Sequence, residues 1–370
     1  MNAAISRTMT PEGAWSKMVT RQQELLLKDD AMKDLLASMV MQAMGKPLEE
    51  TMTFAKVNNE AATYDKLIDA LEAKQICSAV LRQSGWSDFD DFDAKFFDPR
   101  SKNSACGFLA GSDRLRLYSI FLTRAVRKSE SGKELTDENY AKVKAVQGML
   151  GITDADETNT FRKLFGPELQ RTLSMAMFEI VGDDFTPTLL ENMKELVRDV
   201  IKNYRLSADL VYEYAAPLYS RAVRMINDKA PSGVPTSQQM DQLNALRDLL
   251  GLSKDDTYGP HVEVFGAAYK SGVLEAMGAT GVIRKEFREP LVDLRNRLGV
   301  SEEAAKKLFL EAVEEKMAPM IEWIVLELER TILTPAQLSQ KRQKDFGEDY
   351  FKTGKGASVN IFHSIVIFLK

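Results

Sequence analysis

The segment RLGVSEEAA, residues 297–305, contains the end of one predicted helix and the start of the next. Leu298 would end the first helix, and Gly299 can adopt the positive φ at which many helices stop. After one apolar residue, Ser301 supplies the side chain that caps the N-terminus of a following helix. The order glycine, apolar residue, serine or threonine therefore predicts two helices joined by a very short turn.

The same order of residues recurs along the chain. It is found as MLGITDADE at 149–157 and LLGLSKDDT at 249–257, and in weaker form as NYRLSADLV at 203–211 and QSGWSDFDD at 83–91. The weaker copy at 203–211 has Arg205 where the others have glycine. The capping residues stand at 87, 153, 207, 253 and 301, which are 66, 54, 46 and 48 residues apart. This spacing predicts a repeated helix–turn–helix unit of about 50 residues.

A second mark lies between these copies and predicts the start of the other helix in each unit. Thr is the predicted N-cap there, and in several copies Pro follows at the first helical position, where its missing N–H costs nothing. The marks are Thr10, Thr136, Thr186, Thr236 and Thr334, and a missing mark would fall near Ile283. Each unit is thus expected to consist of two helices.

The apolar residues between the marks follow a helical period. In residues 302–328 they recur at spacings of three and four, and no segment between residues 10 and 345 alternates as a strand would. The sequence therefore predicts an all-α fold, an elongated α-solenoid of HEAT-like repeats. One proline falls inside each downstream second helix and should bend it. These prolines are Pro167, Pro217, Pro260 and Pro319.

The repeat also predicts how the chain is organised. We expect N-terminal helices of the array in residues 1–83, a repeat with an inserted acidic and aromatic loop in 84–135, regular repeats in 136–345 and a C-terminal tail in 346–370. The insertion explains the long step of 66 residues between the first two caps. All four segments would belong to one continuous solenoid.

Composition narrows the range of functions. The chain has 370 residues, 44% of them hydrophobic, and 54 Asp and Glu against 49 Lys and Arg, a net charge of −5. This balance disfavours a basic nucleic-acid-binding face, and no apolar run is long enough to span a membrane. With two cysteines and two histidines there is little material for a zinc site or a disulfide framework, so no cofactor or metal is predicted.

No arrangement of residues in the sequence predicts catalysis. The acidic cluster of Asp88, Asp90, Asp91 and Asp93 lacks the glycine and glutamate of a calcium-binding EF-hand loop. The acids Asp29, Asp30 and Asp34 have the wrong spacing for a magnesium diphosphate site, and His261 is predicted to be a surface or packed histidine. The chain is therefore expected not to be an enzyme.

Two groups of residues remain as candidates for function. Met32, Met39, Met41 and Met44 lie in one N-terminal stretch, and flexible thioethers suit surfaces that accept varied apolar peptides. The alternative is that they are core methionines of an amphipathic helix. Cys77 and Cys106 form a candidate redox pair, with two unrelated reduced thiols as the alternative.

In these repeated phrases and in the last unit, LRNRLGVSEEAAKKLFLEAVEEKMAPMIEWIVLELERTILTPAQLSQ (residues 294–340), the chain resembles the stromal region of the large scaffold subunit of the Tic complex. That complex is the protein translocon of the chloroplast inner envelope. The resemblance covers residues 6–350 and concerns helix boundaries rather than catalytic motifs.

The resemblance implies a scaffold for protein import at the stromal side of the inner envelope. Such a scaffold would bind transit peptides of precursors, recruit an Hsp100-type motor and a chaperonin, and contact other Tic subunits. It also implies a thioredoxin-sensitive disulfide, which the resemblance does not assign to particular cysteines. The family is membrane-anchored, and this chain is expected to be a soluble, non-spanning stromal fragment of it. Two alternatives stay open, a pore-forming component of the import channel and an all-α enzyme.

Overall fold

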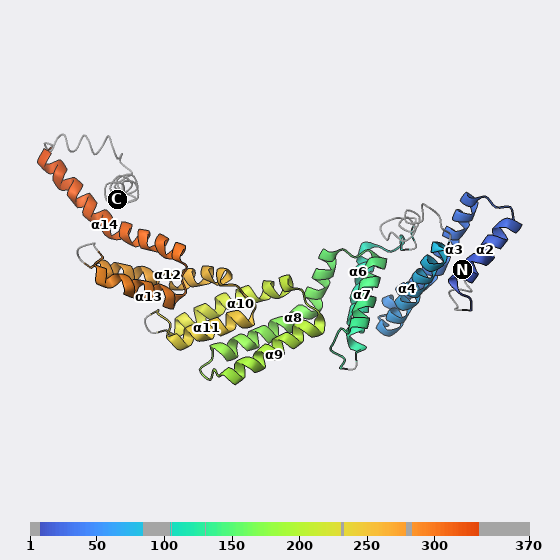
Figure 1. The fold of residues 1–370 in the computed structure, drawn as a ribbon, viewed down its shortest axis with the longest axis horizontal. Coiled ribbons are helices and arrows are strands. Elements are labelled where there is room, and N and C mark those ends of the chain that lie inside the picture. Colours follow the sequence, from blue (N-terminus) through green and yellow to red (C-terminus); the bar gives the residue numbers. More distant parts are fainter. Residues whose placement is uncertain are drawn as a thin grey trace. The chain divides into compact units, whose positions relative to one another are not determined.

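The computed structural model describes residues 8–83, 104, 106–129, 131–230, 233–278 and 283–332. These residues are helical with short turns, and no strand occurs among them, so the predicted all-α class is confirmed. The helices are α2 (Pro11–Glu24), α3 (Asp29–Lys56), α4 (Glu60–Arg82), α6 (Gly111–Arg127), α7 (Asp137–Leu150), α8 (Asp154–Val181), α9 (Pro187–Tyr204), α10 (Ala208–Lys229), α11 (Ser237–Leu249), α12 (Lys254–Met277), α13 (Arg288–Leu298) and α14 (Glu302–Ile332), and a 3₁₀-helix η1 (Lys285–Phe287) precedes α13 (Figure 1).

The glycine of the repeated phrase ends a helix in a left-handed conformation. Gly151, Gly251 and Gly299 have φ values of 65°, 68° and 63°. In each copy the N–H of the following apolar residue donates to a carbonyl five residues earlier, at 3.0 Å for Ile152 to Gln147, 3.0 Å for Leu252 to Arg247 and 3.2 Å for Val300 to Arg295. This is the Schellman ending of a helix, and it confirms the predicted turn.

Three other turns have the same geometry without glycine. Arg205 has φ 52°, Asn58 has φ 55° and Leu26 has φ 51°, and each is followed by the same backbone hydrogen bond. The prediction that Arg205 stands in the place of the glycine is confirmed. The turns at Leu26 and Asn58 were not predicted, because neither has the glycine or the full phrase. A side chain in this region costs about 1–2 kcal/mol.

Contacts with the start of α7 offset this cost at Arg205. Its Nε donates to the carbonyl of Leu135 at 2.9 Å, and its guanidinium pairs with Asp137. The guanidinium also lies over the ring of Tyr140, 5.0 Å from the centroid. Arg205 therefore joins the turn between α9 and α10 to the start of α7, which a glycine could not do.

The threonine marks cap helices as predicted wherever the structure describes them. The Oγ1 atoms of Thr10, Thr136, Thr186 and Thr236 accept from the N–H three residues on, at 3.2–3.3 Å. Near Ile283, where a mark is missing, η1 begins after Arg284, whose side chain makes no capping bond. Thr334, Ser87, the acidic cluster 88–93, most of the inserted loop and the tail lie outside the described residues.

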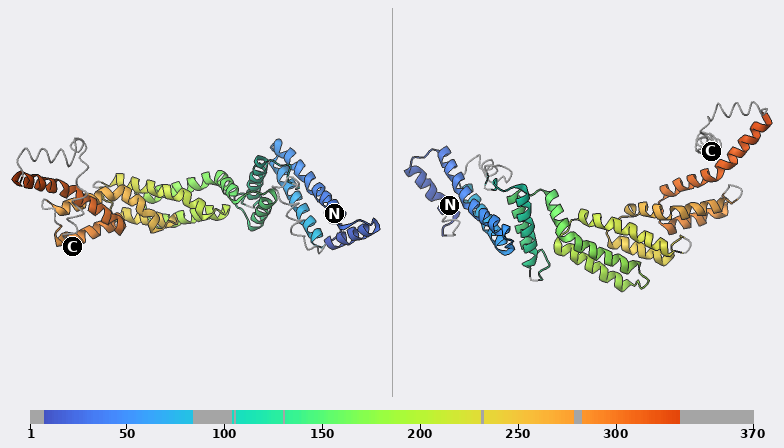
Figure 2. Two further views of the ribbon diagram at one scale, coloured as in Figure 1. Left: turned by 90° about the horizontal axis from the view of Figure 1, so that it is seen from above. Right: turned by 180° about the vertical axis from the view of Figure 1, so that it is seen from behind.

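The chain forms two compact units. Unit 1 contains Met1–Thr172 and Glu195–Val211, and unit 2 contains Leu173–Lys194 and Tyr212–Lys370. Helices α8, α9 and α10 each contribute residues to both. Figure 2 shows the helices of each unit from two further directions, with α3 and α4 side by side. The continuous solenoid stays a prediction.

The core of unit 1 contains a stacked pair of aromatic rings, and a polar network lies beside it around the buried Tyr118. Tyr64 of α4 stacks on Phe121 of α6 with centroids 4.5 Å apart, and both are buried. Glu157 accepts from the hydroxyl of buried Tyr118 at 3.1 Å and from Nζ of Lys144 at 2.6 Å. Burial raises the pKa of Tyr118, so its hydroxyl stays protonated and remains a donor. These contacts hold α6, α7 and α8 together.

The core of unit 2 contains His261, whose side chain contacts the C-terminal end of α13. Its Nδ1 lies 2.8 Å from the carbonyl of Leu298, and its Nε2 lies 2.8 Å from the hydroxyl of Tyr219. Because a carbonyl only accepts, Nδ1 carries the proton and Nε2 accepts from Tyr219. Burial lowers the pKa of His261, which therefore is neutral at pH 7. His261, predicted to be a surface or packed histidine, is packed and joins α10, α12 and α13.

Substitution of two glycines separates backbone strain from packing. Gly251→Ala adds only the cost of a left-handed side chain, about 1–2 kcal/mol, because nothing lies near the new Cβ. Gly299→Ala places its Cβ 2.4 Å from Nδ1 of His261 and should be clearly more destabilising. Urea unfolding followed by circular dichroism measures both. If both variants lose the same free energy of unfolding, the side chain of His261 moves aside without destabilising the protein.

The buried histidine predicts a pH dependence of stability. Its folded pKa lies below the ordinary value of 6.5, so its contribution is complete above about pH 6.5 and is lost as the pH falls through the folded pKa. His261→Gln should be less stable than the wild type at pH 7.5, and the difference should shrink towards pH 5. Unfolding midpoints of both proteins across this range test it. A constant difference would contradict the neutral, buried imidazole.

Candidate functional site

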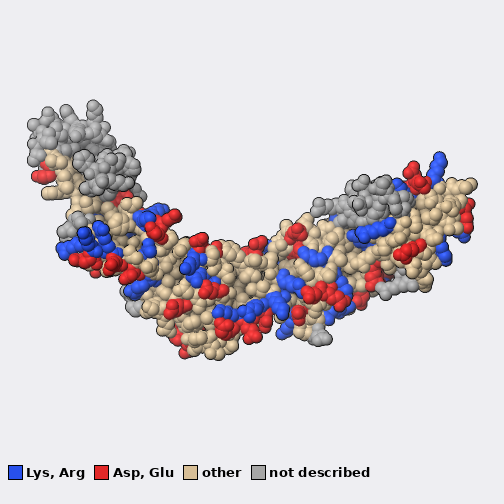
Figure 3. Space-filling model, in the orientation of Figure 1, with Lys and Arg blue, Asp and Glu red and all other residues tan. Residues whose placement is uncertain are grey.

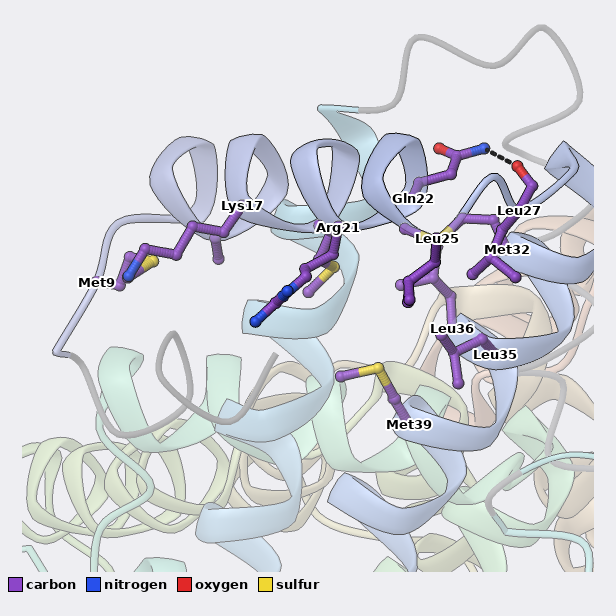
Figure 4. A pocket seen from close by; sticks show the side chains of 12 residues that line it. Met9, Lys17, Arg21, Gln22, Leu25, Leu27, Met32, Leu35, Leu36 and Met39 are labelled. Atoms are coloured by element: carbon purple, nitrogen blue, oxygen red, sulfur yellow. Dashed lines mark hydrogen bonds between the residues drawn. The ribbon is translucent and has the colours of Figure 1, made fainter.

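An open pocket of about 450 Å³ lies between α2 and α3 in unit 1 (Figure 4). Its walls are mainly apolar, and helix α2 brings the polar side chains to it. The lining consists of four methionines (Met9, Met18, Met32, Met39), four leucines (Leu25, Leu27, Leu35, Leu36), Ala14, and the polar Lys17, Arg21 and Gln22. A pocket of this size and apolar character is typical of binding sites for small ligands or side chains of a partner.

The turn between α2 and α3 keeps the pocket open. Helix α2 ends at Glu24 with Leu25 as its C-cap, and the next residue, Leu26, takes a positive φ. The side chain of Gln22 then holds the turn, because its Nε2 donates to the carbonyl of Leu27 at 3.3 Å and to Asp29 at 2.8 Å. Both α2 and α3 pack on α4, so they share a neighbour and leave a gap between them.

Large apolar side chains are exposed around this gap. The exposed fractions are 62% for Leu25, 89% for Leu26 and 47% for Leu35. A cluster of exposed leucines beside an apolar pocket is typical of a surface that a partner covers.

The structure places the predicted methionines differently. Met32 and Met39 line the pocket, whereas Met44 is buried in the core at 1% exposure. Met41 is partly exposed and does not line the pocket. The prediction missed Met9 and Met18, which lie on the opposite wall. The sequence does indicate this wall, because Ala14, Met18 and the C-cap residue Leu25 have the spacing of one face of α2.

The charges at the pocket are all basic. Lys17 and Arg21 stand one turn apart on α2, and no Asp or Glu is among the described residues that line the pocket. Figure 4 shows both side chains leaving the same side of α2. Arg21 pairs with Glu24 at 2.6 Å, while Lys17 makes no ion pair within the part of the chain that the structure describes. The rim therefore favours a ligand that carries negative charge.

A second hollow, of about 510 Å³, is lined by Tyr64, Lys128 and Lys142 among others. Its charges are already paired. Lys128 bonds Asp65 at 3.0 Å and lies 4.2 Å from the centroid of Tyr64, and Lys142 bonds Glu138 at 2.6 Å. The first pair joins the C-terminal end of α6 to α4, and the second lies within α7, so we assign this hollow to the fold.

The two cysteines are free thiols inside unit 1. Cys77 is 0% exposed and Cys106 is 3% exposed, and the Cys106 thiol donates to the carbonyl of Met149 at 3.3 Å. Burial raises the pKa of Cys77 to about 12 and that of Cys106 to about 11. Both therefore stay protonated at neutral pH, which is the unreactive form of the thiol.

The described residues contain no metal site. No three or more His, Cys, Asp or Glu side chains in this part of the chain are placed so that they could hold a metal ion. Asp29, Asp30 and Asp34 lie at the start of α3, where Asp29 accepts from Gln22. None of the described helices combines the length and the apolar character needed to cross a membrane.

Comparison with known proteins finds no matching family model, no matching curated protein and no matching solved structure. The pocket is therefore interpreted from its own residues.

The burial of the thiols predicts slow chemical modification. In the native protein at pH 7.5, a thiol-alkylating reagent should label Cys77 and Cys106 far more slowly than after denaturation, because both are covered and protonated. Mass spectrometry of the two peptides over time measures each rate. Native labelling as fast as that of the unfolded chain would contradict the burial and would favour a redox role.

Proposed function

We propose that this chain is a non-enzymatic helical scaffold that holds apolar segments of other polypeptides. The observation that carries the proposal is the open, methionine-lined pocket between α2 and α3 with its basic rim. Repeated helix pairs are a common framework for such binding, because stacked pairs display side chains over an extended surface.

The lining of the pocket suits varied apolar ligands. Its methionine side chains rotate about three bonds and fill irregular gaps, so one pocket can accept leucine, phenylalanine or tryptophan. An amphipathic helix that presents apolar residues at spacings of three and four could place two of them in the pocket. The exposed Leu25 and Leu35 would be covered at the same time.

The rim sets the charge of the preferred ligand. Lys17 and Arg21 attract an apolar segment that also carries Asp or Glu, and they disfavour a basic one. Transit peptides are rich in arginine and poor in acids. We therefore propose that this pocket receives an acidic, apolar segment of a chaperone or of another subunit, and that transit peptides are bound elsewhere on the scaffold.

This assignment agrees with a role in chloroplast import at the stromal face of the inner envelope. The repeated phrases that resemble the Tic scaffold subunit support that setting. Neither the pore nor the enzyme alternative has a supporting observation among the described residues.

Two synthetic amphipathic peptides test the proposal. Both carry leucine at positions i, i+3, i+4 and i+7, one with glutamates and the other with lysines on the remaining face. The glutamate peptide should bind the wild type more tightly in fluorescence anisotropy, and Lys17→Glu/Arg21→Glu should reverse the order. We expect a change of about three- to tenfold, since an exposed ion pair contributes about 0.2–1 kcal/mol.

The control variant is Lys46→Glu/Arg82→Glu, which makes the same change of net charge at exposed residues that do not line the pocket. It should bind like the wild type. Equal binding of both peptides by all three proteins would refute a selective pocket.

A further inference from the structure

The end of helix α14 carries an exposed apolar surface. Near its start, the side chains of Ala305 and Ala312 are buried where α14 packs on α12. Figure 1 shows the helix continuing beyond α12 and α13. In that continuation Trp323 is 65% exposed, Ile324 is 49% exposed and Leu326 is 39% exposed. A surface tryptophan with apolar neighbours is typical of a protein–protein contact.

The same segment is acidic. Between Lys316 and Arg330 the sequence contains Glu322, Glu327 and Glu329 and neither Lys nor Arg. We refer to residues 317–328, with this apolar surface and the acidic Glu322 and Glu327, as the α14 end. It combines apolar side chains with negative charge on one helix, which is the kind of ligand that the pocket in unit 1 favours.

We propose that the α14 end of one copy of this chain binds in the α2–α3 pocket of a second copy. The inference rests on the proposed function, because it uses the same pocket. Trp323 and Ile324 would enter among Met18, Met32 and Met39. The acidic side chains of the α14 end, Glu322 and Glu327, would then face the basic rim. Each partner contributes an apolar surface that is exposed in the single chain and a charge opposite to that of the other.

Such a contact does not close on itself. The pocket belongs to unit 1 and the α14 end belongs to unit 2, so the two sides of the interface are different surfaces. A pair of copies still has one free pocket and one free α14 end, and association continues as the concentration rises. A client peptide would compete with the second copy for the pocket.

Sedimentation velocity at increasing protein concentration tests this head-to-tail association. The wild type should shift to larger species, and the shift should weaken at high salt because screening reduces the charge attraction. The variant Trp323→Ser/Ile324→Ser lacks two of the apolar side chains of the α14 end. The variant Lys17→Glu/Arg21→Glu/Met39→Glu reverses the charge of the pocket rim and places a charge in its apolar lining. Each variant alone should remain a monomer.

Mixing the two variants gives the sharpest result. One has a working pocket and the other a working α14 end, so an equimolar mixture should form a dimer and nothing larger. Leu310→Ser, at a residue on the same helix that is 61% exposed, is the matched control and should associate like the wild type. Circular dichroism of every variant checks that the helices are kept.

Three outcomes would overturn the inference: a wild type that stays monomeric at all concentrations, a pocket variant that associates like the wild type, or a mixture that forms no dimer. The α14-end variant, which keeps the pocket, distinguishes a failure of this inference from a failure of the proposed function. If it binds the glutamate peptide while the wild type does not associate, only the inference fails. If copies associate through the pocket but no peptide binds, only the proposed function fails.

Discussion

The structure depends on one local interaction, the hydrogen bond from the N–H that follows a left-handed residue to the carbonyl five residues earlier. This bond ends a helix without leaving its last carbonyls unpaired, and it turns the chain at once into the next helix. At Ile152, Leu252 and Val300 the residue that donates it is apolar and buried, so the turn also contributes to the core. Caps such as Ser253, which bonds reciprocally with Asp256, then start the next helix within two residues of the glycine.

The exceptions to this pattern show which part of it is indispensable. Arg205, Asn58 and Leu26 adopt the left-handed conformation without glycine, so the backbone geometry is kept where the residue type is not. Arg205 offsets the strain through its contacts with Leu135, Asp137 and Tyr140. Gly299 is the opposite case, because His261 lies so close to it that any Cβ would collide with the ring. The same turn therefore tolerates an arginine at one position and only glycine at another.

Exposed apolar surface is concentrated where a helix lacks a covering neighbour. The pocket opens because α2 and α3 both pack on α4 and not fully on each other, and the α14 end is exposed because α14 continues past α12. Elsewhere on the face seen in Figure 3, Lys and Arg side chains are interspersed with Asp and Glu, as is usual for a solvated surface. The partner sites that we propose thus arise from incomplete helix packing rather than from reactive groups, and the raised pKa values of Cys77 and Cys106 agree with this view.

The sequence by itself determined the all-α class and most of the helix boundaries, though not the turns at Leu26 and Asn58, because a helix end depends on residues within about six positions of one another. The glycine and serine phrases, the threonine caps and the all-α class could therefore be predicted, and so could the place of Arg205 in the repeated phrase. The site could be predicted only in part. Met32, Met39 and Met44 have similar helical spacing, and only the packing of α2 and α4 around α3 decided that the first two line a pocket and the third is core. The partners of His261 were likewise decided by tertiary structure, since Tyr219 and Leu298 lie about 40 residues away in the sequence and no local pattern records which helices meet.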